Sequence, residues 1–365
     1  MKKNMQQIPN LTSLRFILAL LVVIFHTPEF FANRNLPYFK DYSLFLRGNE
    51  SVWIFFSLSG FLIIRQLFNE KINSNSINLK RFFLNRIYRI FPLYYLVLIF
   101  GFIHYQIILP KLGFQFENSY NILEGILLSV TFFSNIFLTY SPGGIIEILW
   151  SIGIEEQFYI FIAPLFYFIP KSKLKTTLIL LTVVYLLLFI SNMFPLLTEY
   201  KMFFFFFTFS GLCSIYFEKT HFNKLFSNLI YLITLIYLFS NLFKNNLNEN
   251  QYYIFSMILF GFFLSVLSKK PIFILENQTL KYLGTISYGI YMLHAIAMQI
   301  VGLLYIKLKI ENKIPEYLYI FSYSFLIILL TITMAHLSYK YYESYFLKFK
   351  KSLQHTTNRQ SITNR

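Results

Sequence analysis

The chain has 365 residues, of which 56% are hydrophobic and only 13% are charged. Soluble globular domains carry about 25% charged residues, so this composition excludes a water-soluble domain and indicates an integral membrane protein. The formal net charge of +16 does not indicate a nucleic-acid partner, because no stripe of Lys and Arg alternates with polar surface. The single cysteine, Cys213, excludes a disulfide framework and a cysteine-based metal site, and we expect no bound metal.

Eleven apolar segments, each close to the roughly 20 residues that cross a bilayer, follow one another along the chain. The first segment contains two ionisable residues and lacks a small-residue cleavage site, so we interpret it as a retained helix and not as a signal peptide. The fourth segment is too polar for a membrane span, because Glu124, Ser129, Ser134 and Asn135 interrupt it. We predict that it is interfacial or re-entrant and that about ten helices cross the membrane. The segments cover residues 11–31, 50–68, 88–109, 121–139, 148–169, 176–195, 202–217, 226–243, 252–268, 283–305 and 317–338.

The distribution of Lys and Arg predicts the orientation of these helices, because short cytoplasmic loops of membrane proteins carry an excess of cations. If segment 121–139 does not cross, 23 of the 32 Lys and Arg residues fall on one side and 9 on the other. This bias places both termini in the cytoplasm. The sequence thus predicts an all-α fold, a polytopic integral membrane helical bundle, with one domain over residues 1–350 and a polar, disordered tail over residues 351–365.

Ionisable side chains inside the predicted membrane segments are candidates for function, since each costs about 2.5–3.5 kcal/mol to insert. Arg15 and His26 are eleven residues apart, which places them on one face of the first helix with a rise of about 16 Å between them. His26, Glu155 and His294 come from three helices and are expected at comparable depth in the outer half of the bundle. The complete set is Arg15, His26, Glu155, Glu156, His294 and His336.

A polar stripe follows the ninth predicted helix. Ser287, Tyr291 and His294 are spaced four and then three residues apart, so they share one helix face. Such a stripe lines a cavity or makes hydrogen bonds between helices, and both explanations stay open for Tyr291 and His294. An interhelical hydrogen bond is the favoured explanation for His336, whereas a functional role is favoured for His26 because a buried cation is in phase with it.

Two arginines on the cytoplasmic side form a further pattern. Arg86 and Arg89 are three residues apart, just before or within the first turn of the third helix, and would present two guanidinium groups side by side. Guanidinium binds phosphate through paired hydrogen bonds, so this spacing suits a phosphate-containing ligand. The alternative is the general excess of cations in cytoplasmic loops, which does not explain the preference for Arg over Lys.

Five motifs resemble those of acyltransferase family 3, a family of membrane O-acyltransferases, and they occur in the family's order over nearly the whole chain. Two features depart from the family pattern. Glu343 is followed by Ser344 and Tyr345 and not shortly by Pro, so this end of the chain is given no role. Many members also carry a C-terminal esterase-like domain, and we expect a form of the enzyme that lacks it. The motifs lie at residues 15–26 (Arg15 and His26), 53–63 (WIFFSLSGFLI), 86–92 (RIYRIFP), 149–159 (LWSIGIEEQFY) and 283–294 (LGTISYGIYMLH).

The resemblance implies that an acyl group, usually acetyl, passes from cytoplasmic acyl-CoA to a hydroxyl of a glycan on the extracytoplasmic side. Arg86 and Arg89 would bind the CoA phosphates, and the pantetheine arm would carry the thioester past Arg15. His26 would be the general base, a role that suits imidazole, and Glu155 would orient or protonate a histidine. The residues expected to line the substrate path are Ser59, Trp150, Ser287, Tyr291 and His294.

The implied partners are acetyl-CoA as the donor substrate, a glycan or lipid-linked glycan as the acceptor, and the lipid bilayer of a bacterial cytoplasmic (inner) membrane. Direct transfer and transfer through a covalent enzyme intermediate both stay open. Two other classes of protein are kept as alternatives. A transporter or flippase for a glycan or lipid-linked precursor would not require the paired arginines, and a structural or sensory membrane protein would tolerate replacement of His26.

Overall fold

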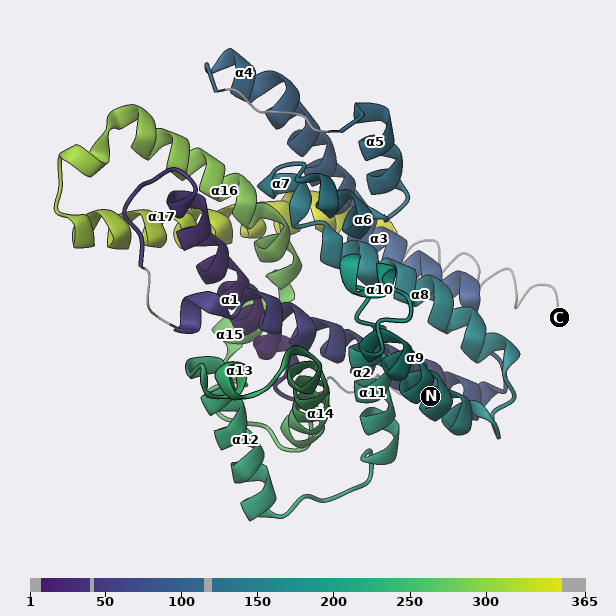
Figure 1. Ribbon diagram of the computed structural model, residues 1–365. Coiled ribbons are helices and arrows are strands. Elements are labelled where there is room, and N and C mark those ends of the chain that lie inside the picture. Colours follow the sequence, from purple (N-terminus) through teal and green to yellow (C-terminus); the bar gives the residue numbers. More distant parts are fainter. Residues whose placement is uncertain (1–7, 40–42, 115–119, 350–365) are drawn as a thin grey trace.

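The computed structural model describes residues 8–39, 43–114 and 120–349 (Figure 1). Within these ranges every regular element is a helix, which confirms the predicted all-α, polytopic membrane fold. The polar tail predicted over residues 351–365 lies outside the described residues, and the single domain over residues 1–350 stays a prediction.

Ten apolar helices of the described chain correspond one to one with the ten predicted membrane helices. Six of them are long and apolar enough to cross a bilayer, if α3 and α17 are taken with the short turns that extend them. Three others are shorter apolar helices, and α8 carries two glutamates. The number of helices that cross and the side of the termini stay predictions. The ten are α1 (Leu11–Ala32), α2 (Gly48–Ser74), α3 (Leu79–Ile103), α8 (Trp150–Phe168), α9 (Leu174–Ile190), α11 (Phe204–Tyr216), α12 (Lys224–Phe239), α14 (Glu249–Leu267), α16 (Ser287–Leu308) and α17 (Glu316–Leu337).

Short helices and single turns connect these elements or extend them. Two of the turns have π-helical hydrogen bonding, η2 at the end of α3 and η5 at the end of α17. The short elements are η1 (Ser43–Leu46), η2 (His104–Ile108), α4 (Leu109–Lys111), α5 (Ile122–Val130), α6 (Ser134–Phe137), η3 (Leu138–Tyr140), α7 (Gly144–Glu147), α10 (Leu196–Glu199), α13 (Leu242–Asn246), α15 (Gln278–Thr285), η4 (Ile310–Asn312) and η5 (Ser338–Glu343).

The segment 121–139 forms two short helices, α5 and α6, with a break between them. The nine residues of α5 rise about 13.5 Å, less than half of the roughly 30 Å hydrocarbon core, so this helix does not span a bilayer. At the break, Phe132 adopts a left-handed backbone conformation with φ of 63°. The structure therefore agrees with the prediction that this segment does not cross the membrane as one helix.

The break between α5 and α6 is docked onto α8. The side-chain amide of Gln157 donates to the backbone oxygen of Phe132 at 2.8 Å and to Oδ1 of Asn135 at 2.7 Å. A Cβ atom at Gly153 would lie 2.6 Å from the oxygen of Phe132, so only glycine permits this approach. Two residues of the 149–159 motif thus hold segment 121–139 against the start of α8.

The helix α2 lies at the centre of the bundle, where it packs against α1, α8, α11 and α14 (Figure 1). Its backbone meets that of α11 at Gly60, where a Cβ atom would lie 2.1 Å from the oxygen of Phe207. Ser210 of α11 donates to the backbone oxygen of Ser57 at 2.6 Å. Small residues allow membrane helices to approach closely, which accounts for the serine and glycine of the 53–63 motif.

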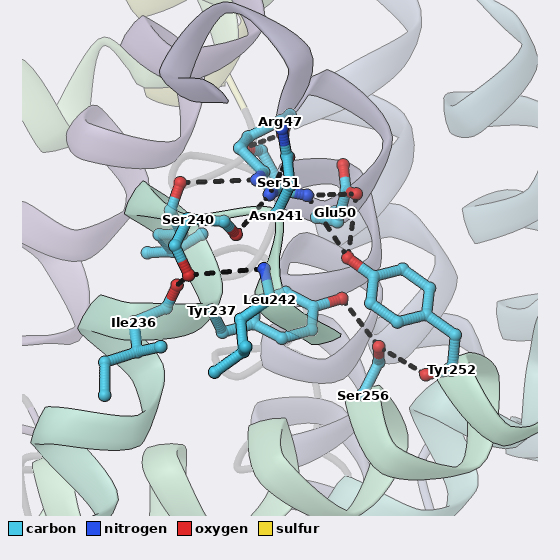
Figure 2. Close-up of polar contacts among 11 residues, drawn as sticks. Arg47, Glu50, Ser51, Ile236, Tyr237, Ser240, Asn241, Leu242, Tyr252 and Ser256 are labelled. Carbon is cyan, nitrogen blue, oxygen red and sulfur yellow. Dashed lines mark hydrogen bonds and ion pairs between the residues drawn. The ribbon is translucent and has the colours of Figure 1, made fainter. Parts of the chain in front are cut away.

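A buried arginine fastens the first residues of α2 to two neighbouring helices (Figure 2). Arg47 is fully buried, and its Nη1 donates to Oε1 of Glu50 at 3.0 Å. Its Nη2 donates to the backbone oxygen of Ser240 at 2.5 Å and to Oδ1 of Asn241 at 2.6 Å, at the end of α12. The hydroxyl of Tyr252, on α14, donates to the same oxygen of Glu50 at 3.0 Å. The network joins α2, α12 and α14 at one end of the bundle.

Candidate active site

One part of the candidate site, called the outer part after the predicted orientation, is a pair of stacked imidazole rings. α1 carries His26 and α16 carries His294, and the two helices pack against each other. The ring centroids are 5.4 Å apart, and the ring planes differ by 28°. The structure thus brings together two residues that the sequence places at comparable depth.

His294 is completely buried, and one of its ring nitrogens is free. Its Nδ1 lies 2.5 Å from the backbone oxygen of Tyr291. A carbonyl oxygen only accepts hydrogen bonds, so Nδ1 carries the hydrogen, and Nε2 of the neutral ring is an acceptor. This Nε2 has no hydrogen-bond partner among the described residues. A buried polar atom without a partner is costly, which makes this nitrogen a candidate contact for a bound molecule.

A carboxylate that the sequence analysis did not select contacts the other imidazole. Glu29 lies one turn after His26 on α1, and its Oε2 is 3.0 Å from Nδ1 of His26. The side chain of His26 is 33% exposed and that of Glu29 is 55% exposed. The i,i+3 spacing of a histidine and a glutamate at the outer end of a helix is the sequence signal that could have found this pair.

A lysine and a second carboxylate complete the outer group, and neither was predicted. Lys201 and Glu147 lie within electrostatic range of Glu29. The ammonium of Lys201 is 5.0 Å from the ring centroid of Trp150, at the start of α8. Burial lowers the pKa of Lys201, while the charges of Glu147 and Glu29 oppose this change. Trp150, predicted to line the substrate path, therefore lies beside a charged group.

The other part of the site, called the inner part after the predicted orientation, is a cluster of charges around Arg15. Arg15 lies within electrostatic range of Glu155 and Arg89. The hydroxyl of Ser59 donates to Oε1 of Glu155. Glu155 thus contacts Ser59 and lies within electrostatic range of the arginines. The contacts of His26 in the described chain are instead with Phe25, Glu29 and His294, so a role of Glu155 in orienting a histidine stays a prediction.

The two arginines that the sequence predicts on the cytoplasmic side occupy different environments. Arg86 is buried, with its guanidinium carbon 3.5 Å from the ring centroid of Phe82 and 5.0 Å from that of Tyr159. Its Nη1 donates to the backbone oxygen of Phe82 at 2.9 Å. Arg89 is exposed. α3 begins at Leu79, so both arginines lie beyond the first two turns and not at the helix start as expected.

The remaining residues of the predicted stripe connect helices. The hydroxyl of Tyr291 donates to the backbone oxygen of Ile148 at 2.9 Å and lies 2.7 Å from Oγ of Ser151. This contact agrees with the alternative that Tyr291 makes hydrogen bonds between helices. Ser287 is buried at the first residue of α16. His336, for which an interhelical bond was favoured, lies 2.5 Å from the hydroxyl of Tyr282.

Two buried carboxylates near the inner cluster were given no role from the sequence. Glu156 follows Glu155 on α8, and its Oε1 lacks a hydrogen-bond partner in the part of the chain that the structure describes. Glu343 lies in η5, accepts from the hydroxyl of Ser338 at 2.9 Å, and is within electrostatic range of Arg89. The described residues contain no group of three or more His, Cys, Asp and Glu side chains that could hold a metal ion.

These observations define a class: a multi-pass helical membrane protein with a pair of imidazole rings and a cluster of arginines and glutamates around Arg15. The model of the acyltransferase domain family, acyltransferase family 3, matches residues 8–336, and the chain belongs to this family. The predicted family and the predicted acyltransferase activity are thereby confirmed.

Curated relatives are similar in sequence at a low level of identity. A protein of Acidianus two-tailed virus, named as an acetyltransferase by inference, is 28% identical over 85% of this chain and 88% of its own length. A protein of Staphylococcus aureus (strain COL), named as an O-acetyltransferase by inference, is 24% identical over 95% of this chain. The chain spans 58% of the length of that staphylococcal relative. No solved structure matches the chain.

Proposed function

We propose that the protein is an O-acetyltransferase that moves an acetyl group from cytoplasmic acetyl-CoA to a hydroxyl of a glycan on the outer side of a bacterial cytoplasmic membrane. The observation that carries the proposal is the stacked pair of His26 and His294, with a free Nε2 on His294, on helices that also reach the inner arginines. Membership of the acyltransferase family supports acyl transfer. The names of the relatives support an acetyl group as the group that is transferred and an oxygen atom as its acceptor.

The donor is assigned to the inner cluster because its phosphates require cations. Arg89 is exposed and can reach phosphate oxygens from the cytoplasmic side. The pantetheine arm then passes Arg15, which is on the same helix as His26 and eleven residues before it. That separation corresponds to about 16 Å along a helix, which is the distance from Arg15 to His26 that the arm has to cover.

The acceptor hydroxyl is assigned to the outer group. His26 removes the proton of this hydroxyl while its oxygen attacks the thioester carbonyl. The new carbon–oxygen bond forms, the carbon–sulfur bond breaks, and the thiolate of CoA receives the proton. The products are the acetyl ester and CoA as a free thiol.

Replacement of His26 tests this proposal in cells. We expect that a strain expressing the wild-type chain carries O-acetyl groups on its surface polysaccharide that a strain without the protein lacks. His26→Ala removes these groups, since a general base contributes about 10²–10⁴ in rate. Mass spectrometry of the polysaccharide before and after mild alkali measures the ester, and immunoblotting of membranes shows that the variant is inserted.

The matched control is His336→Ala, which replaces a histidine bonded to Tyr282 and outside the proposed site. This variant should keep the acetyl groups. Acetylation that survives in the His26→Ala strain would reject His26 as the base. A polysaccharide that is missing from the surface, and not merely unacetylated, would favour the transporter or flippase class.

A further inference from the structure

We propose that Glu29 is a positioning residue that fixes the orientation and the tautomer of the general base His26. The inference rests on the proposed function and adds a residue that the family motifs quoted above do not contain. Glu29 lies three residues after His26 on α1, and Pro28 lies between them inside the same helix.

The contact itself determines which nitrogen of His26 is free. Oε2 of Glu29 is 3.0 Å from Nδ1 of His26. An ionised carboxylate only accepts hydrogen bonds, so Nδ1 carries the hydrogen. In the neutral ring Nε2 then holds the lone pair, and this is the atom that can remove a proton from an acceptor hydroxyl.

The partners of the two stacked rings assign different roles to them. The Nδ1 of His26 faces a carboxylate, which stabilises the imidazolium ion that forms when the ring takes a proton. The Nδ1 of His294 faces only the backbone oxygen of Tyr291, and His294 is completely buried. A charge on His294 would therefore lack a counter-ion, whereas a charge on His26 has one at hydrogen-bond distance.

Charged groups from other elements also surround this pair. Glu147 of α7 and Lys201, between α10 and α11, act on Glu29, and Glu147 acts on His26 as well. His294 of α16 faces His26 from the opposite helix. Two carboxylates and one ammonium therefore lie around the imidazole pair, and Glu29 is the carboxylate at hydrogen-bond distance from His26.

In the reaction step, Glu29 takes no proton. The acceptor hydroxyl transfers its proton to Nε2 of His26, its oxygen forms the ester bond, and the thiolate leaves with the carbon–sulfur electron pair. The imidazolium ion, still bonded to Glu29 through Nδ1, then returns the proton to the sulfur of CoA. This sequence restores the neutral ring in its original tautomer.

Three variants of Glu29 separate charge, hydrogen bond and side-chain length. Glu29→Gln keeps an oxygen acceptor for Nδ1 but removes the charge, Glu29→Leu removes both, and Glu29→Asp keeps the charge on a shorter side chain. We expect the acetylation rate of the surface polysaccharide to fall about tenfold to a hundredfold in Glu29→Leu, less in Glu29→Gln, and to recover partly in Glu29→Asp, because the whole contribution of the base is about 10²–10⁴. Glu199→Gln, at the exposed end of α10, is the control that should keep the wild-type rate.

A second measurement does not depend on acetylation. The full chain, labelled with ¹⁵N at its six histidines and reconstituted in lipid nanodiscs, reports the protonated nitrogen of each ring by its chemical shift, and His26→Asn identifies the signal of His26. We expect the wild-type protein to show a protonated Nδ1 and a free Nε2 at His26. Glu29→Gln and Glu29→Leu should show a mixture of tautomers, because a Gln amide can donate to Nδ1 as well as accept from it and Leu does neither.

The two measurements distinguish failure of this inference from failure of the proposed function. A wild-type acetylation rate in Glu29→Leu, in a strain where His26→Ala is inactive, would overturn the inference alone. A protonated Nε2 at His26 in the wild-type protein would overturn it even if the chain acetylates no glycan. If His26→Ala retains acetylation while the tautomer is as expected, the assignment of the base fails and the pairing of Glu29 with His26 survives.

Discussion

At the scale of single residues, the two arginines of the 86–92 motif are not equivalent. Arg86 is buried and stacked on the ring of Phe82, with a second aromatic ring of Tyr159 nearby. Stacking of guanidinium on aromatic rings stabilises a fold by roughly 0.5–2 kcal/mol. Arg89 is exposed, so its guanidinium group is accessible to a ligand. We therefore assign phosphate binding mainly to Arg89 and support of the site mainly to Arg86.

Replacing the two arginines separately tests this division. Arg89→Ala should weaken acetyl-CoA binding about tenfold to a hundredfold without lowering thermal stability, since a hydrogen bond to a charged group contributes about 1.5–3 kcal/mol. Arg86→Ala should lower the unfolding temperature as well as the affinity. Isothermal titration calorimetry in detergent measures binding, and a thermal unfolding scan measures stability.

A lysine at each position provides the matched control. Arg86→Lys retains the charge but loses the flat stacking surface, so it should be less stable than the wild-type protein. Arg89→Lys should retain part of the affinity, because ammonium binds phosphate as a point charge. Unchanged affinity in Arg89→Ala would remove Arg89 from the donor site.

At the scale of elements, the start of α2 depends on a buried ion pair. Arg47 and Glu50 are both buried, and the network in Figure 2 joins them to α12 and α14. One carboxylate oxygen of Glu50 has no hydrogen-bond partner within the described chain. Loss of one member of such a pair costs about 3–5 kcal/mol because it leaves an uncompensated buried charge.

Substitution of this pair should therefore be strongly non-additive. Arg47→Met should lower the unfolding temperature markedly, and the double variant Arg47→Met with Glu50→Leu should be more stable than Arg47→Met alone. Thermal unfolding of the purified protein, followed by tryptophan fluorescence, measures both. The control is Arg81→Met, which breaks the ion pair between the exposed Arg81 and the partly buried Glu70 and should cost about 1 kcal/mol. A double variant that is less stable than Arg47→Met would show that the ion pair is not the main contribution of these two residues to the stability of the fold.

At the scale of the whole molecule, the ten-helix arrangement makes a prediction about sidedness. Cys213 is the single cysteine and is buried, so Cys213→Ala provides a background without thiols. In that background Asn245→Cys, in the exposed α13, should react in intact cells with a membrane-impermeant thiol reagent. Ser172→Cys, exposed between α8 and α9, should react only after the cells are permeabilised. Equal labelling of both positions in intact cells would contradict the arrangement.

Much of the architecture could be predicted from hydropathy because membrane helices satisfy their backbone hydrogen bonds internally. The predicted spans match α1, α16 and α17 closely, and the interrupting polar residues correctly marked 121–139 as different. The predicted start of α3 was too late in the chain, because the helix begins at Leu79, before its apolar segment. Arg86 and Arg89 therefore lie on turns within the helix. Helix extension into a polar region has no hydropathy signal.

The candidate site could be predicted only where a polar residue stands out in an apolar segment. His26 and His294 met this criterion, and the structure places their rings together. Glu29 and Lys201 lie near helix ends, where charged residues are ordinary, so their proximity to the imidazoles depended on tertiary structure. The partner of Glu155 likewise could not be read from the sequence, because Ser59 belongs to a different helix.

The short distance between the two imidazole rings limits the positive charge that they can carry together. Two positive charges 5.4 Å apart repel each other by about 3 kcal/mol at an effective dielectric constant of about 20. In the proposed mechanism the proton taken from the acceptor hydroxyl therefore resides on one ring, and the buried His294 contacts the substrates as a neutral hydrogen-bonding group.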